Sequence, residues 1–274
     1  MSLHETKKDI ALLTIVKNEN YFLKKWLSYY GQYFKNNDIY VIDHETSDGS
    51  TKNLDVNLTY ITNNNKISTK WLCEVVEEYH EKLLEKYNAV MYTDVDEFIF
   101  TKDGSNLKEY INKKISDGTN CFISTGYNLF HWKQKEPNPI DYYKPLFAQR
   151  QFVKPESCYN KPFLFNYVPR FNLGFHTAQN EQPYNQKQRN DPNLIMIHTK
   201  LYDQQESVKR YLERYKNSIN EDTAGQDQGW ILNGQVDKFL WHHFPDKNEP
   251  YDPRFASAIE LDKLLSNHDY KNII

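Results

Sequence analysis

The residues from Ile10 to Val16 form an apolar run with several β-branched side chains. Such a run is typical of a strand that is buried on both faces, as the strands of a parallel sheet are. Phe22, Trp26 and Tyr29 then recur at helical spacing, which predicts a helix, and Asn18 is the expected N-cap. The chain therefore opens with a strand and a helix, and this order favours an α/β fold.

The alternation of strand and helix continues through the first hundred residues. A long helix is predicted by Leu72, Val76 and Leu83, which share one helical face. The other runs that predict strands are 39–43, 58–62 and 89–93. We expect a mostly parallel central sheet with helices on both faces, because alternating strands and helices pack in that way.

The second half is less regular, and no linker divides the chain. We interpret residues 1–274 as one domain. Strands are predicted at 121–125, 147–153 and 194–198, a helix at 208–219, and loops at 136–143 and 155–183.

Polar residues gather where four successive strands of the first half end. They are Lys17 to Glu19, Asp43, Asn63 to Asn65, and Asp94 with Asp96. In open α/β sheets, ligands bind beyond the carboxyl ends of the strands. We therefore expect one shared site at this edge of the sheet.

Asp94 and Asp96 follow the apolar strand that ends at Thr93. In extended backbone, residues two apart point the same way. Such a pair suits Mg²⁺ or Mn²⁺, which bind carboxylate and water oxygens and are completed by substrate phosphates. The alternative is a solvated strand end with a structural Asp, but the buried strand and the following Glu97 favour a metal site.

Two phosphate-binding motifs are missing. No G-x-G-x-x-G follows the first strand, and no G-x-x-x-x-G-K-[ST] occurs. With only 9 Gly in the chain, phosphate has to be held by a metal and side chains. The nucleophile loop of a metal-dependent phosphohydrolase fits poorly, because that loop usually lies on an early strand and has Thr or Val shortly after its second Asp.

Composition argues against further classes of protein. The formal charge of −3 and the lack of a long Lys/Arg run argue against binding to nucleic-acid phosphates. No stretch approaches the roughly 20 apolar residues that cross a bilayer, and no apolar signal region follows the polar N-terminus. We expect a soluble or cytoplasmic protein in which Cys73, Cys121 and Cys158 are reduced thiols.

Four segments of the first hundred residues occur in a characteristic order. They are Thr14-Ile15-Val16-Lys17-Asn18-Glu19, Val41-Ile42-Asp43, Ser47-Asp48-Gly49-Ser50 and the DxDEF segment Asp94-Val95-Asp96-Glu97-Phe98. In this order they resemble the opening of family 2-like and family 92-like glycosyltransferases. The resemblance implies a GT-A fold, with residues 1–100 as a nucleotide-binding half and residues 101–274 as an acceptor-side half.

The resemblance also implies how a nucleotide-diphosphate sugar would bind, with UDP- or GDP-sugars as the donor class. Base and ribose would be contacted by Val16, Asn18, Asp43 and the Asn64 region. Lys161 could neutralise the diphosphate.

The same resemblance places Mn²⁺ or Mg²⁺ on the DxD carboxylates. Asp96 would bind the metal itself, and Asp94 would lie near the ribose or the metal. His198 is our first choice for another metal ligand, since it ends the apolar run 194–198. The diphosphate is the leaving group, and its developing charge needs a cation there.

Inversion at the sugar requires a carboxylate base near the acceptor hydroxyl. The candidates are Asp227 and Asp191, with Glu181 as a further one and His242 or His243 as alternative metal ligands. Aromatic residues in irregular segments either line a site for a glycan or other hydroxyl acceptor or pack in the core. They are Tyr127, Phe130, Trp132, Tyr142 and Tyr143.

Three functional hypotheses follow from the sequence. The leading one is a metal-dependent, inverting glycosyltransferase that moves a sugar to a hydroxyl acceptor. The second is a nucleotidyl or phosphoryl transferase that uses the same two carboxylates. The third is a non-catalytic sugar-binding module, since a fold does not guarantee activity.

Overall fold

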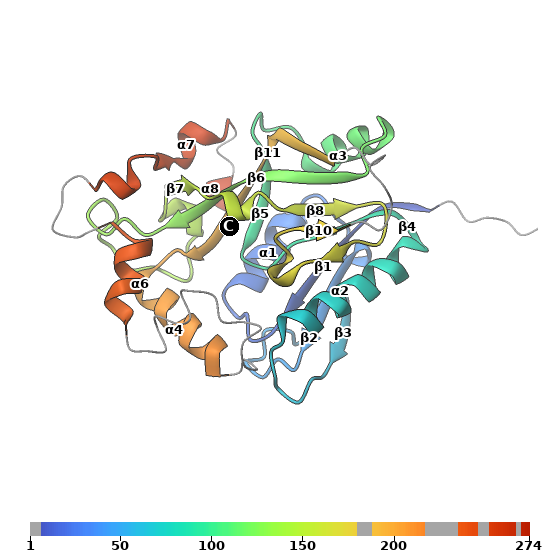
Figure 1. Ribbon diagram of the computed structural model, residues 1–274, viewed down its shortest axis with the longest axis horizontal. Coiled ribbons are helices and arrows are strands. Elements are labelled where there is room, and N and C mark those ends of the chain that lie inside the picture. The colour runs from blue at the N-terminus through green and yellow to red at the C-terminus, as the bar shows by residue number, and fades with distance from the viewer. Residues whose placement is uncertain (1–6, 180–187, 217–234, 246–251, 267–269) are drawn as a thin grey trace, which may run out of the picture.

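The computed structural model describes residues 7–179, 188–216, 235–245, 252–266 and 270–274. Its centre is a ten-stranded sheet (Figure 1). The strands of this sheet are β1 (Lys8–Val16), β2 (Ile39–His44), β3 (Asn57–Ile61), β4 (Tyr87–Tyr92), β5 (Glu97–Thr101), β6 (Cys121–Phe130), β7 (Phe152–Pro155), β8 (Pro162–Phe165), β11 (Gln188–Leu201) and β12 (Ile259–Glu260). A separate two-stranded sheet consists of β9 (Arg170–Phe171) and β10 (Ala178–Gln179).

Helices surround the sheet. The α-helices are α1 (Phe22–Tyr30), α2 (Thr69–Leu84), α3 (Leu107–Ser116), α4 (Gln204–Lys216), α6 (Val236–His243), α7 (Leu261–Leu264) and α8 (Tyr270–Ile273). The 3-10 helices are η1 (Asn36–Asp38), η2 (Leu146–Ala148), η3 (Ser157–Tyr159), η4 (Leu173–Phe175) and η5 (Pro253–Phe255). Within the described parts of the chain, none of the helices is both long enough and apolar enough to cross a membrane.

The strand β1 lies in the middle of the sheet and is buried on both faces. Ile10 and Leu12 belong to the same apolar cluster as the buried side chains of α1. Ala11 and Leu13, which point the other way, belong to the cluster that contains the buried side chains of α2. The expected α/β class, with helices on both faces of a central sheet, is therefore confirmed.

The direction of the strands changes across the sheet. In the first half, β3, β2, β1 and β4 are parallel neighbours in that order. In the second half, β8 is antiparallel to both β4 and β6, β7 is antiparallel to β6, and β11 is antiparallel to β5 and parallel to β6. The sheet is therefore mixed rather than mostly parallel. Between β6 and β8 the chain forms β7 and the short 3-10 helices η2 and η3, without the α-helix that usually connects parallel neighbours.

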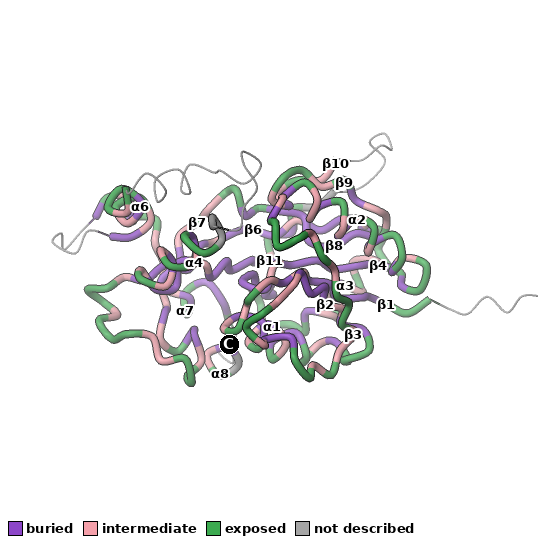
Figure 2. The backbone as a smooth tube through the Cα atoms, turned by 90° about the horizontal axis from the view of Figure 1, so that it is seen from below, coloured by how far each residue is buried: buried purple, intermediate pink, exposed green. Residues whose placement is uncertain are grey.

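Residues from both halves of the chain share this sheet. The strand β4 pairs with β8, and β5 pairs with β11. At the end of β6 and β11, Phe130 and Leu201 pack with Tyr211 of α4 and Phe239 of α6. Figures 1 and 2 show α4 and α6 at the end of the molecule away from β4.

Several predicted elements differ in detail from the structure. The predicted strand 58–62 is β3, but it is a sheet edge with Leu58 43% and Tyr60 63% exposed, whereas most of β4 and residues 194–199 of β11 are buried (Figure 2). The predicted strand 147–153 divides into η2 and β7. The predicted loop 155–183 contains β8, which covers the edge of β4.

Candidate functional site

An open cavity of about 1360 Å³ lies at the carboxyl ends of β1, β2 and β4. It is lined by the ends of β1 and β2, the turn between β4 and β5, the end of β11, and α4. Five of the predicted site residues besides Val16 line it, namely Asn18, Asp94, Asp96, Lys161 and His198. The structure therefore brings these residues together at one edge of the sheet.

Asp94 and Asp96 lie in a turn and not in extended backbone, which corrects the sequence-based geometry. Glu97 N donates to the carbonyl of Asp94 at 3.0 Å, and Glu97 Oε2 accepts from Asp94 N at 3.1 Å. This tight turn connects β4 to β5 directly. The two aspartate side chains consequently have different partners, although both line the cavity.

The carboxylate of Asp94 is held by two protein groups. Its Oδ1 accepts from the Tyr92 hydroxyl at 2.8 Å, and its Oδ2 lies 3.3 Å from Lys161 Nζ. Lys161 is buried, and its Nζ also lies 2.5 Å from Glu97 Oε1. Burial alone would lower the pKa of Lys161, but Asp94 and Glu97 outweigh this effect and raise it above its usual value. Lys161 therefore stays charged and neutralises the turn.

Glu97, His198 and Asn128 lie side by side on three neighbouring strands. His198 of β11 is paired in register with Glu97 of β5 on one side and with Asn128 of β6 on the other. All three residues are at most 5% exposed. Burial raises the pKa of Glu97, against the opposing effect of Lys161. The register of these three strands therefore places the three polar side chains next to one another.

The Asn128 contact determines the protonation of His198. His198 Nδ1 lies 2.7 Å from Asn128 Oδ1, so Nδ1 carries the proton and donates it. Burial, assisted by Lys200 and Lys161, lowers the pKa of His198 well below its usual value, so the ring is neutral. Its Nε2 therefore presents a lone pair, and it lies 3.8 Å from Asp96 Oδ1.

The Asp96 and His198 pair has the donor set and spacing for one divalent cation. Metal to oxygen or nitrogen distances are about 2.0–2.2 Å, so two ligands on opposite sides of one ion lie at most about 4.0–4.4 Å apart. Over the described residues, no group of three or more His, Cys, Asp or Glu side chains is close enough to hold a metal alone. These residues fit an Mn²⁺ or Mg²⁺ ion that substrate phosphates and water complete.

Neighbouring residues fix the position of both candidate ligands. The Tyr159 ring stacks on the His198 ring with centroids 4.0 Å apart. The backbone carbonyl of Asp96 accepts from Thr199 N at 2.8 Å and from Thr199 Oγ1 at 2.9 Å. The residue after His198 therefore ties β11 to the turn that carries Asp96.

Arg210 of α4 is a site residue that sequence reasoning missed. Its Nη2 lies 3.0 Å from Glu19 Oε1 and 3.4 Å from Asp96 Oδ2. No local sequence pattern indicates these contacts, because Glu19 and Asp96 are 191 and 114 residues away from Arg210 along the chain. Only the fold places α4 beside the turn that follows β4.

Asn18 organises the loops and does not cap a helix. It has a positive φ of 56°, and its Oδ1 accepts from Ser47 N at 2.8 Å and from Asp48 N at 3.2 Å. The helix α1 begins at Phe22 without a side-chain cap. The predicted N-cap is therefore wrong, and Asn18 instead joins the loop after β1 to the turn after β2.

Asp43 and Asn64, expected at base and ribose, lie outside the cavity lining. Asp43 accepts from Thr46 N at 2.8 Å and from Thr51 Oγ1 at 2.7 Å, so its carboxylate holds the turn after β2. Asn64 is exposed beyond β3 and donates its backbone N–H to Thr62 Oγ1 at 3.4 Å. In the structure both residues contact their own loops, and their contact with a ligand stays a prediction.

Asp191, expected as a catalytic base, also lies outside the cavity lining. Its two carboxylate oxygens accept from the Tyr110 hydroxyl at 3.0 and 2.9 Å, and Lys114 Nζ lies 3.5 Å away. Both partners belong to α3, so Asp191 attaches β11 to that helix. Its assignment is corrected to a structural one. Asp227 and Glu181 lie outside the described residues.

The aromatic candidates divide between cavity and core. Tyr142 and Tyr143 line the cavity and are 47% and 100% exposed. Phe130 is fully buried in the apolar cluster with α4 and α6. Tyr127 and Trp132 are partly buried and pack against apolar clusters. His242 and His243, at the end of α6, do not line the cavity.

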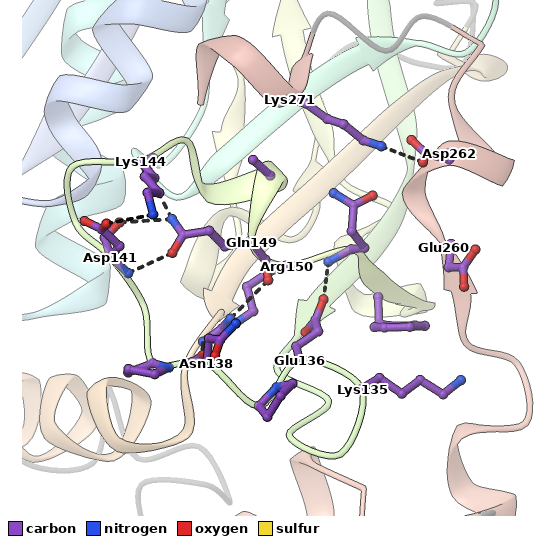
Figure 3. Close-up of a pocket in the computed structure, with 15 residues that line it drawn as sticks. Lys135, Glu136, Asn138, Asp141, Lys144, Gln149, Arg150, Glu260, Asp262 and Lys271 are labelled. Carbon is purple, nitrogen blue, oxygen red and sulfur yellow. Dashed lines mark hydrogen bonds and ion pairs between the residues drawn. The ribbon is translucent and has the colours of Figure 1, made fainter.

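A second cavity of about 760 Å³ is lined by residues around 135–152 and by the segment near α7 and α8, and contains none of the predicted site residues. Its buried Arg150 donates to the carbonyl of Tyr202 at 2.8 Å. Glu136, which also lines this cavity (Figure 3), accepts from Gln151 N at 2.6 Å. We assign this cavity no role in the chemistry, because these buried charges have protein partners.

Comparisons with known proteins complete the description of the site. No protein-family model matches the chain, and no curated protein matches it. Among solved structures, the chain is similar to residues 1–349 of S. aureus TarS, with 11% identity, 85% of this chain and 72% of that chain covered, and a TM-score of 0.41. The same TarS segment in complex with UDP gives 11% identity, the same coverage and a TM-score of 0.39. The chain is also similar to the mannosyltransferase PcManGT from Pyrobaculum calidifontis in complex with GDP-Man and Mn²⁺. The identity is 8%, 86% of this chain and 70% of that chain are covered, and the TM-score is 0.39.

Proposed function

We propose that the chain is a metal-dependent glycosyltransferase that moves a sugar from a nucleotide-diphosphate sugar to a hydroxyl acceptor with inversion. The observation that carries this proposal is the pair of Asp96 and neutral His198, 3.8 Å apart, in a large cavity at the carboxyl ends of parallel strands. The DxDEF segment that supplies Asp96 is also the segment that resembles glycosyltransferases.

The donor would lie across the end of β1. Val16 and Asn18 line the cavity there, and the loop joined by Asn18 contributes Ser47 and Asp48 to the same wall. This wall offers backbone and amide groups for a nucleoside, while Asp96 and His198 line the same cavity for the diphosphate. UDP- and GDP-sugars are the donor classes to test.

Side chains of this chain would prepare the departure of the nucleoside diphosphate. Asp96 and His198 would hold an Mn²⁺ or Mg²⁺ ion, which supplies positive charge for the leaving diphosphate. Asp94 stays bound to Tyr92 and Lys161 and would support this ion from the same wall of the cavity. Lys161 is already engaged by two carboxylates, so we assign it the neutralisation of the turn first and contact with phosphate second.

The acceptor would enter beside Tyr142 and Tyr143, the exposed aromatic residues of the cavity. Aromatic faces pack against the C–H faces of sugar rings, and this supports a glycan acceptor. Inversion needs a carboxylate base near the acceptor hydroxyl. Asp227 remains our proposal for that base.

The proposal is tested by measuring hydrolysis or transfer of UDP- and GDP-sugars with and without Mn²⁺. We expect turnover that depends on metal in the wild type and a loss of about 100-fold or more in Asp96→Asn, because one ligand is removed. An Asp96→Asn variant with the wild-type metal-dependent rate would refute it. Release of pyrophosphate or phosphate instead of nucleoside diphosphate would indicate a nucleotidyl or phosphoryl transferase. Glycan binding indifferent to Mn²⁺ and nucleotide would indicate a non-catalytic module.

A further inference from the structure

Arg210 connects three separate parts of the site. From α4, its Nη2 lies 3.0 and 3.2 Å from the carboxylate oxygens of Glu19 and 3.4 Å from Asp96 Oδ2. The guanidinium also lies over the Phe22 ring, 4.5 Å from its centroid. Glu19 precedes α1 and Asp96 follows β4, so one side chain joins two loops that line the cavity.

The position of Arg210 brings it into competition with a cation. Asp96 is the carboxylate proposed to bind the metal, and its Oδ2 is already close to a guanidinium. A divalent ion bound to Asp96 would place two positive groups within a few ångström of each other, and like charges at that distance repel. An anion that contacts both groups would remove this repulsion.

The guanidinium has a donor available for such an anion. Arg210 Nη1 is buried and has no hydrogen-bond partner among the described residues, while Nη2 carries the carboxylate contacts. An arginine fork suits phosphate oxygens in particular, because its planar donors bind two of them at once. The contact with the Phe22 ring helps to hold the guanidinium beside Asp96.

We infer that Arg210 is a movable counter-ion, which pairs with Asp96 and transfers to the diphosphate of the donor when Asp96 binds the metal. This inference rests on the proposed function. It makes metal binding and donor binding mutually dependent: the cation alone has to displace Arg210 from Asp96, whereas the cation together with a nucleoside diphosphate gives Arg210 a new partner.

The test compares Arg210→Gln with wild type in two calorimetric titrations. In the first, Mn²⁺ alone is titrated into the protein. In the second, UDP or GDP is titrated at saturating Mn²⁺. We expect Mn²⁺ alone to bind about 3- to 10-fold more tightly to Arg210→Gln, because the competing charge is gone. We expect the nucleoside diphosphate to bind about 10- to 100-fold more weakly, because a charge-assisted hydrogen bond is lost.

Two further variants make the result decisive. Arg170→Gln is the matched control, because Arg170 of β9 lies outside the cavity lining and forms a similar ion pair, with its Nη1 3.0 Å from Glu77 Oε2. In this variant the affinities for Mn²⁺ and for the nucleoside diphosphate should both stay at wild-type values. Arg210→Lys keeps the charge but loses the fork, so Mn²⁺ affinity should stay unchanged while nucleoside diphosphate affinity falls. Arg210→Lys also decides the matter if Arg210→Gln does not fold.

The outcomes separate this inference from the proposed function. If Arg210→Gln weakens both ligands, or changes neither, Arg210 is only a structural residue and the inference is wrong while the glycosyltransferase proposal stands. If the wild type binds neither Mn²⁺ nor a nucleoside diphosphate, both are wrong.

Discussion

The carboxylates of the turn between β4 and β5 have separate environments and therefore separate roles. Asp94 is bound by Tyr92 and Lys161, and Glu97 is fully buried against the same Lys161. Asp96 faces His198 and Arg210. Only Asp96 thus has a neutral nitrogen ligand beside it, which makes it the side chain on which the metal hypothesis depends.

Asn128 is expected to orient His198 for metal binding. In Asn128→Ala, His198 Nδ1 loses the acceptor at 2.7 Å, so the ring is no longer held with Nε2 towards Asp96. Loss of such a supporting hydrogen bond lowers metal affinity about 10- to 100-fold. Calorimetric titration of Mn²⁺ in the presence of UDP or GDP measures this. Asn36 is an exposed amide away from the cavity, so Asn36→Ala should leave the Mn²⁺ affinity unchanged. A wild-type Mn²⁺ affinity in Asn128→Ala would show that Asn128 has no orienting role.

At the residue scale, the sequence identified candidate ligands but not their partners. Asp94, Asp96 and His198 each follow an apolar strand, which is a local pattern and can be recognised. Arg210 lies in a predicted helix among apolar residues, where nothing local distinguishes it from a solvated side chain. Asp43 ends its strand and was predicted to contact the base or ribose of a donor. In the structure its carboxylate accepts hydrogen bonds from the turn that follows the strand.

The 3-10 helix η3 is an element whose position depends on a single glycine. A Cβ on Gly126 of β6 would lie 2.3 Å from the carbonyl carbon of Tyr159, so β6 and η3 approach too closely for any other residue. This close approach places the Tyr159 ring on His198. The element therefore needs glycine at position 126, and the sequence pattern of the strand does not reveal it.

Gly126→Ala is expected to displace η3 and to lower the free energy of unfolding by about 2–3 kcal/mol, the cost of an overpacked core position. Urea denaturation measures the change. Ser124→Ala lies in the same strand but adds no volume, so it should lower the free energy of unfolding by distinctly less than Gly126→Ala. An unchanged unfolding midpoint in Gly126→Ala would contradict the close packing of β6 on η3.

The helix α2 contains a buried histidine that makes stability depend on pH. His80 is fully buried, its Nδ1 lies 2.9 Å from the carbonyl of Val76, and burial lowers its pKa to about 4. Between pH 6.5 and pH 4 the unfolded chain binds a proton that the folded chain does not. Stability from this residue is therefore present above pH 6.5 and is lost as the pH falls towards 4.

His80→Leu should remove this contribution. The difference in unfolding free energy between wild type and His80→Leu should shift by about 2 kcal/mol in favour of the variant between pH 7 and pH 4.5. Urea denaturation at the two pH values measures it. A difference that does not change with pH would show that His80 is not buried in its neutral form.

Strands and helices could be predicted where a local run or spacing of apolar residues marks them. The strand and helix order from β1 to β4 agrees with the apolar runs, because parallel strands buried on both faces have few polar residues. The helix α3 and the strand β5 were not predicted. In β5, five buried residues follow the aspartates directly, and the sequence does not show that the chain turns there.

At the scale of the whole molecule, one sheet joins the two halves of the chain, and the site lies where they meet. β11 from the second half lies between β5 and β6, and it brings His198 to the turn that carries Asp96. The mixed direction of the strands could not be predicted, because short strands joined by loops have the same apolar pattern in either direction. The location of the cavity could be predicted, because it follows from the ends of the parallel strands.

The most direct measurement of the central claim is thermal unfolding with UDP or GDP, with and without Mn²⁺. For the wild type, a nucleoside diphosphate at about 100 times its Kd, with Mn²⁺, should stabilise the fold by about 2.7 kcal/mol and raise Tm by several degrees. Asp96→Asn should lose the part of this rise that requires Mn²⁺. Asp117→Asn, an exposed carboxylate after α3, should keep it. An equal Mn²⁺-dependent rise in Asp96→Asn and wild type would show that Asp96 does not hold the cation on which the donor binds.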